Sequence, residues 1–82
     1  MALIARIDEV PAGRQVVHGP VECGWRWFTA EGERILQLDT YGSAERKLQG
    51  KVSQSIQLDE KAARELAEIL HRVFPTAVPR PT

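Results

Sequence analysis

The fold is decided by residues 23–40, CGWRWFTAEGERILQLDT. Apolar and polar side chains alternate along residues 21–29 and again along residues 34–41, which is the two-residue period of half-buried strands. Glu31 and Gly32 between them predict a two-residue hairpin turn, because glycine readily adopts positive φ. This turn pairs both indoles with leucines, whereas a three-residue loop would pair them with Gln and Asp, so burial of aromatic area favours the shorter turn. The predicted cross-strand pairs are Trp27–Leu36, Trp25–Leu38 and Cys23–Thr40.

Two further strands and one helix are expected outside this hairpin. Residues 2–10 predict a first strand, residues 51–58 predict the last one, and symmetric pairing across the preceding loop sets Leu36 beside Ile56 and Thr40 beside Val52. Asp59 is expected to cap a helix whose apolar residues recur at helical spacing until Pro75. The sequence therefore predicts an α+β domain over residues 1–75, a four-stranded antiparallel β-meander packed against one C-terminal α-helix, followed by a loose proline-rich tail over residues 76–82.

The predicted sheet has one covered and one uncovered face. We expect the helix to cover the face that carries Trp25, Trp27, Leu36, Leu38, Ile56 and Leu58. On that face Cys23 is interpreted as a buried, inert thiol. The opposite face, for which no helix remains, is expected to carry Arg26, Phe28, Ile35, Gln37, Asp39, Tyr41, Lys51, Ser53 and Ser55.

Composition restricts the classes of function. The 82 residues contain 11 basic and 11 acidic side chains, so the net charge is zero, and the single cysteine excludes an internal disulfide. No apolar run approaches the roughly 20 residues that cross a bilayer. Charged residues from Arg6 to Glu9 interrupt any signal-like stretch, so we expect a cytoplasmic protein. We find no motif for catalysis, a cofactor or a metal, and we expect a protein that is not an enzyme.

The uncovered face combines aromatic and basic side chains. Bases stack on aromatic rings while Arg and Lys contact phosphates, so this mixture predicts binding of single-stranded nucleic acid. The candidate residues are Phe28 and Tyr41 for stacking, Arg26 and Lys51 for phosphate contact, and Arg46 and Lys47 on the neighbouring loop. The alternative interpretation is an ordinary solvated face, on which Arg26 and Asp39 form a cross-strand ion pair in water that contributes little to stability.

Three segments resemble the transcriptional positive-cofactor and Whirly-like single-stranded-DNA-binding family. They are Ile35–Tyr41, the pair Gly50-Lys51, and Ile56–Glu60 at the start of the helix. The resemblance covers residues 25–74 and implies a curved antiparallel sheet, dimerisation through the helices and binding of unpaired or locally melted DNA along the sheets. It also implies DNA contacts for Lys51, Arg46 and Lys47. The chain differs from the family in its longer last strand and in lacking a basic excess.

The expected function is therefore non-catalytic binding of single-stranded or locally melted DNA in a transcription-related role. A homodimer is expected because the core is small and one sheet leaves part of the apolar helix stripe uncovered. The alternative function is a small protein–protein adaptor that uses the uncovered sheet face.

Overall fold

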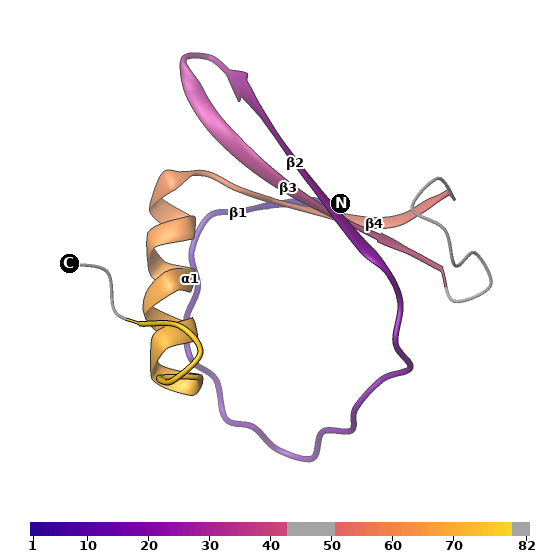
Figure 1. The fold of residues 1–82 in the computed structure, drawn as a ribbon, viewed down its shortest axis with the longest axis vertical. Helices are drawn as coiled ribbons and strands as arrows, with labels where there is room; N and C mark the ends of the chain where they lie inside the picture. The colour runs from indigo at the N-terminus through magenta and orange to yellow at the C-terminus, as the bar shows by residue number, and fades with distance from the viewer. Residues whose placement is uncertain (43–50, 80–82) are drawn as a thin grey trace.

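The structure is a computed structural model and describes residues 1–42 and 51–79. Within these residues lie four strands, β1 (Ala2–Ile4), β2 (Cys23–Ala30), β3 (Glu33–Tyr41) and β4 (Val52–Leu58), and one helix, α1 (Glu60–Val73). The strands form a single sheet in the order β1-β4-β3-β2 (Figure 1). The α+β class and the C-terminal helix are confirmed.

The sheet is mixed, so the expectation of a purely antiparallel meander is wrong. β1 is much shorter than the expected strand over residues 2–10, and it pairs in parallel with β4. A parallel pair requires a crossover connection, and residues 5–22 provide it as an arc that carries the chain from one edge of the sheet to the other (Figure 1). Ile4 of β1 pairs with Leu58 of β4, and Leu58 is only 2% exposed.

The β2–β3 hairpin has the predicted register. Ala30 pairs with Glu33 across the turn, and the two turn residues have φ of 52° at Glu31 and 81° at Gly32. Two successive positive φ values are typical of the tight turn whose twist matches that of the flanking strands. All three predicted pairs, Trp27–Leu36, Trp25–Leu38 and Cys23–Thr40, are confirmed.

The predicted β3–β4 register is wrong by two residues. Leu38 rather than Leu36 lies opposite Ile56, and Thr40 lies opposite Gln54. An irregularity between Thr40 and Tyr41 then shifts the ladder, so that Tyr41 pairs with Val52. Because the offset is an even number, the leucines of β3 remain on the expected face. The sequence prediction assumed a regular ladder without this irregularity, which changes the pairing partner of Tyr41 by one residue.

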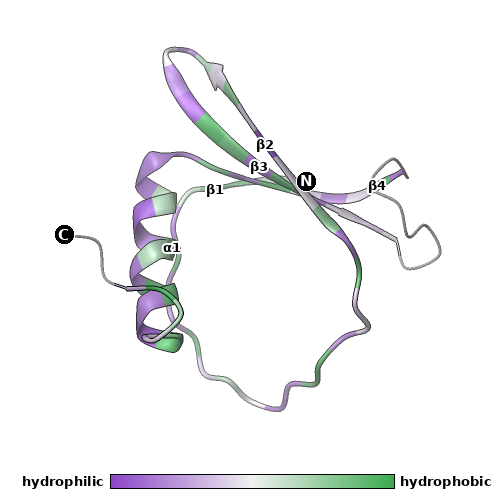
Figure 2. Ribbon diagram, viewed as in Figure 1, coloured by the Kyte–Doolittle hydropathy of each residue, from purple (hydrophilic) through white to green (hydrophobic). Residues whose placement is uncertain are grey.

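The helix begins as predicted. The side chain of Asp59 accepts a 2.9 Å hydrogen bond from the backbone N–H of Ala62. Only Asp59 separates β4 from α1, so the first turn of the helix lies beside the end of β4, and Ala62 is fully buried. The rest of α1 runs away from the sheet, with much of its apolar side toward the arc of residues 5–22 (Figures 1 and 2).

The helix does not cover the indoles. Trp25 is 70% exposed and Trp27 is 57% exposed, so the expectation of a covered indole pair is wrong. The physical reason is the distance across the strands between the helix and the indoles. The helix starts at the end of β4, whereas the indoles are on the edge strand β2, and β3 lies between these two strands. Among the described residues, the buried hydrophobic side chains are those of Tyr41, Leu58 and Ala62.

The chain after the helix turns back toward it. The backbone N–H of Phe74 donates to the carbonyl of Leu70 at 2.8 Å and ends the helix, and that of Val78 donates to the carbonyl of Phe74 at 2.9 Å. Nδ1 of His71 donates to the carbonyl of Val78, also at 2.8 Å. Residues up to 79 are thereby placed beside the helix end, and residues 80–82 lie outside the described part.

Candidate functional site

The four predicted nucleic-acid residues that the structure describes do not form one accessible surface. Arg26 and Phe28 lie two apart on β2 and so share a face, with Phe28 37% exposed. Tyr41 is only 5% exposed and belongs to the core, so the expectation that it offers a ring for stacking is wrong. Lys51 is exposed and directly precedes β4. Arg46 and Lys47 fall in residues 43–50, outside the described residues.

Arg26 is engaged with a buried carboxylate. Its Nη2 lies 3.1 Å from Oδ2 of Asp39, whose side chain is 2% exposed, against 62% for the side chain of Arg26. The expectation of an ion pair between two solvated groups is therefore wrong for Asp39. A basic side chain that neutralises a buried carboxylate offers less charge to a phosphate than a free one.

Asp39 is the centre of a polar network that the strand register creates. It lies opposite Ser55, and Gln37 lies opposite Gln57. Ser55 Oγ donates to Oδ1 of Asp39 at 2.5 Å, and Nε2 of Gln37 donates to the same oxygen at 2.9 Å. Nε2 of Gln57 donates to Oε1 of Gln37 at 2.8 Å and extends the chain of bonds by one member.

These donors lower the pKa of Asp39. The hydroxyl of Ser55 contributes most, followed by the amide of Gln37, and Arg26 adds its charge, while burial acts in the opposite direction. The carboxylate is thus held ionised. Within the described residues, no buried side-chain nitrogen or oxygen lacks a hydrogen-bond partner, so the network has the character of a structural core element.

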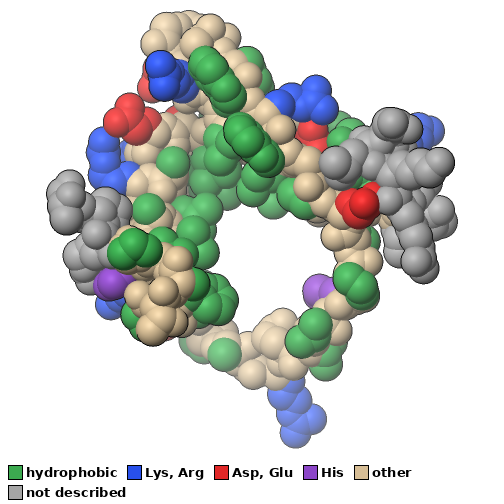
Figure 3. Space-filling model, viewed as in Figure 1, with side chains coloured by type: hydrophobic (Ala, Val, Ile, Leu, Met, Phe, Trp, Pro, Cys, Tyr) green, Lys and Arg blue, Asp and Glu red, His purple; other side chains and the backbone are tan. Residues whose placement is uncertain are grey.

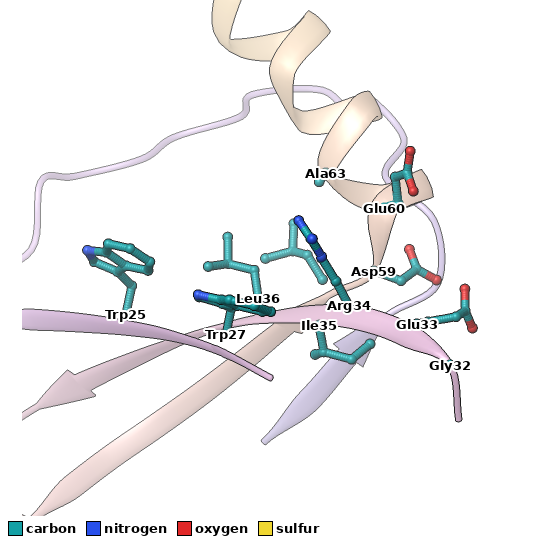
Figure 4. A pocket seen from close by; sticks show the side chains of 11 residues that line it. Trp25, Trp27, Gly32, Glu33, Arg34, Ile35, Leu36, Asp59, Glu60 and Ala63 are labelled. Atoms are coloured by element: carbon teal, nitrogen blue, oxygen red, sulfur yellow. The ribbon is translucent and has the colours of Figure 1, made fainter. Parts of the chain in front are cut away.

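The other side of the sheet, which the helix was expected to cover, carries an open groove. We call it the helix-side groove. Its volume is about 700 Å³, and its apolar lining includes Trp25, Trp27, Leu36, Leu58 and, from α1, Ala63 (Figure 4). Both indoles stand on the side of the sheet toward the helix (Figure 4).

The rim of this groove is charged and mainly acidic. Glu33, Asp59 and Glu60 contribute carboxylates, and Arg34 contributes the guanidinium group. The Cζ atom of Arg34 lies 5.2 Å from the ring centroid of Trp27, within the range of a cation–π contact. The position of Arg34 in the sequence could have indicated this groove. Arg34 lies two residues before Leu36 and therefore on the same face of the strand, where a charged side chain is not expected to be buried.

The cysteine and the metal-ligand types were the other candidate groups. Cys23 is exposed, so the expectation of a buried thiol is wrong. Within residues 1–42 and 51–79, no three His, Cys, Asp or Glu side chains gather as metal ligands would. Over the same residues, no helix combines the length and apolar character that crossing a bilayer requires.

Comparison of the chain with known protein families, with curated proteins and with solved structures finds no match.

Proposed function

We propose that this chain is a non-catalytic protein-interaction module that docks an apolar polypeptide segment in the helix-side groove. The observation that carries the proposal is the exposure of two neighbouring indoles, 70% at Trp25 and 57% at Trp27, over an otherwise aliphatic floor. Contiguous apolar surface of this kind marks interaction sites in soluble proteins. Tryptophan in a pocket is also the residue type that most often dominates the binding energy of an interface.

The charge of the rim indicates what kind of segment fits. Three carboxylates and one guanidinium group lie at this rim, and the guanidinium lies over the ring of Trp27. Glu60 is paired with Arg64 at 3.0 Å and Asp59 accepts the N–H of Ala62, which leaves Glu33 to meet a cation of the segment. A segment with aliphatic side chains and one Lys or Arg would fill the floor and meet opposite charge at the rim. A phosphate backbone would meet like charge there instead.

A titration followed by ¹H–¹⁵N correlation spectra tests this function, because the chain has just two tryptophans and hence two indole N–H signals. We expect both signals to move on addition of a short Val- and Leu-rich peptide with one Arg, and to move less with Glu in place of the Arg. Trp27→Ala should abolish binding. Phe28→Ala is the matched control, because Phe28 is the next residue of β2 and points to the other face. Unmoved indole signals, or equal loss in both variants, would contradict the proposal.

A second candidate function is the binding of single-stranded or locally melted nucleic acid, in a transcription-related role, by the opposite face. It is supported by the exposure of Arg26 and Phe28 on one face of β2 and by the exposed Lys51 near the start of β4. We then expect an oligothymidylate to bind with an affinity that falls as salt rises. Combined Arg26→Ala and Lys51→Ala should weaken that binding, and Trp27→Ala should leave it unchanged. No binding at low salt would exclude this candidate.

A further inference from the structure

The molecule exposes far more surface than a compact protein of its mass. Its accessible surface is 7347 Å² at 9.2 kDa, whereas a compact monomer of this mass exposes about 4,900 Å². Within the described residues, part of this excess of about 2,400 Å² lies on exposed apolar side chains. Large hydrophobic side chains are exposed as well. In addition to the two indoles, Val73 is 61% exposed and Phe74 is 54% exposed.

The connection between β1 and β2 leaves the body of the fold. Residues 5–22 form an arc without helix or strand, and Figure 3 shows an opening that passes through the molecule inside it. Stretches of this length without secondary structure are uncommon in compact domains. At its far end, the carbonyl of Glu22 accepts a 3.0 Å hydrogen bond from the backbone N–H of Tyr41.

The valines in the far part of this arc are exposed within one copy. We call residues 10–18, VPAGRQVVH, the arm. Val10 is 72% exposed, Val16 is 78% exposed and Val17 is 100% exposed. The arm contains no acidic residue and carries one arginine, Arg14. It therefore offers aliphatic side chains to the apolar floor of the groove and one cation to Glu33 at its rim. In its own copy the arm lies on the far side of the opening from the β2–β3 hairpin (Figure 1).

We propose that the occupant of the helix-side groove is a second copy of this chain, with the arm of each copy seated in the groove of the other. This inference rests on the proposed function of the groove. Reciprocal exchange covers the groove and the arm at once, and it gives the self-complementary two-fold arrangement typical of dimers. Obligate homodimers bury about 2,000 Å² or more in total, and the arm and the groove both offer exposed apolar side chains to such an interface. The zero net charge of the chain leaves no overall repulsion between copies.

Val17→Asp tests this arrangement without disturbing a single copy. The side chain of Val17 is 100% exposed, so within one copy it makes no packing contact to lose. We expect the unmodified chain to have twice the 9.2 kDa mass in light scattering and sedimentation equilibrium. A carboxylate buried against the acidic, apolar groove should weaken association about tenfold or more. Thr76→Asp is the control, because Thr76 is exposed outside the arm and the groove, and it should leave the mass unchanged.

Cross-linking locates the arm. In a Cys23→Ser background, one variant carries Val17→Cys on the arm and another carries Glu60→Cys on the groove rim. A short bismaleimide should join the two variants when they are mixed, and the Glu60→Cys variant alone should form little cross-linked product. A monomer at all concentrations, a dimer indifferent to Val17→Asp, or no product from the mixture would overturn the exchange. The peptide titration above would still move the indole signals if only the identity of the occupant were wrong.

Discussion

Asp39 and Ser55 lie directly opposite each other on β3 and β4, and the hydroxyl of Ser55 donates a 2.5 Å hydrogen bond to a carboxylate in a residue that is 1% exposed. A buried charge is tolerable only when its hydrogen-bonding capacity is satisfied. Here the register of the two strands supplies the donors, so the same pairing that orders the sheet also stabilises the charge.

Removal of the Ser55 hydroxyl should destabilise the fold. Ser55→Ala leaves the Asp39 carboxylate with one donor fewer in a buried place, and we expect the Tm to fall by roughly 4–8 °C. Ser53→Ala is the matched control, because Ser53 lies on the same strand and is exposed. Thermal unfolding followed by circular dichroism measures both variants. Equal Tm values for the two would contradict the structural role of the network.

The lowered pKa of Asp39 predicts acid sensitivity. Because the folded-state pKa lies below the ordinary 3.8, the stabilisation is complete above that value and is lost as the pH falls through the lowered pKa. Asp39→Asn should be less stable than the unmodified chain at pH 7, and the difference should shrink below pH 3.8. Urea unfolding at a series of pH values measures this. A difference that stays constant down to pH 2 would contradict the prediction.

The hairpin and the helix start could be predicted from the sequence because their causes are local. Alternation, the Glu31-Gly32 turn and the Asp59 cap act between residues close in the chain. The position of β1 could not, because pairing Ile4 with Leu58 depends on a long crossover whose path no local pattern encodes.

The cover over the indoles was mispredicted for a related reason. The parity of Trp25 and Trp27 correctly indicates their face, but parity says nothing of how far one helix reaches across a sheet. That reach is set by the single residue between β4 and α1, which fixes the helix at one corner. The irregularity between Thr40 and Tyr41 is likewise a feature that a symmetric pairing could not anticipate.

The Asp59 cap can be tested by itself. Asp59→Ala removes the acceptor for the N–H of Ala62, which is fully buried, and should cost about 1 kcal/mol of unfolding free energy. Asp59→Ser retains a side-chain acceptor and should recover most of this loss. Urea denaturation measures both, with an unchanged slope expected because the same surface unfolds. Loss of equal size in both variants would indicate that Asp59 stabilises the helix through its charge.

The hairpin turn offers a stabilising substitution. Glu31 has φ of 52° and Gly32 has φ of 81°, so a glutamate occupies a left-handed position that asparagine adopts at lower cost. We expect Glu31→Asn to raise the unfolding free energy by several tenths of a kcal/mol. Gly32→Ala should lower it by about 1–2 kcal/mol through backbone strain alone, because a Cβ at this position would meet no atom within 4 Å. Opposite signs for these neighbouring variants would show that the backbone conformation of the turn, and not packing around it, determines what these two positions contribute to stability. A destabilising Glu31→Asn would instead mean that the carboxylate makes a contribution of its own.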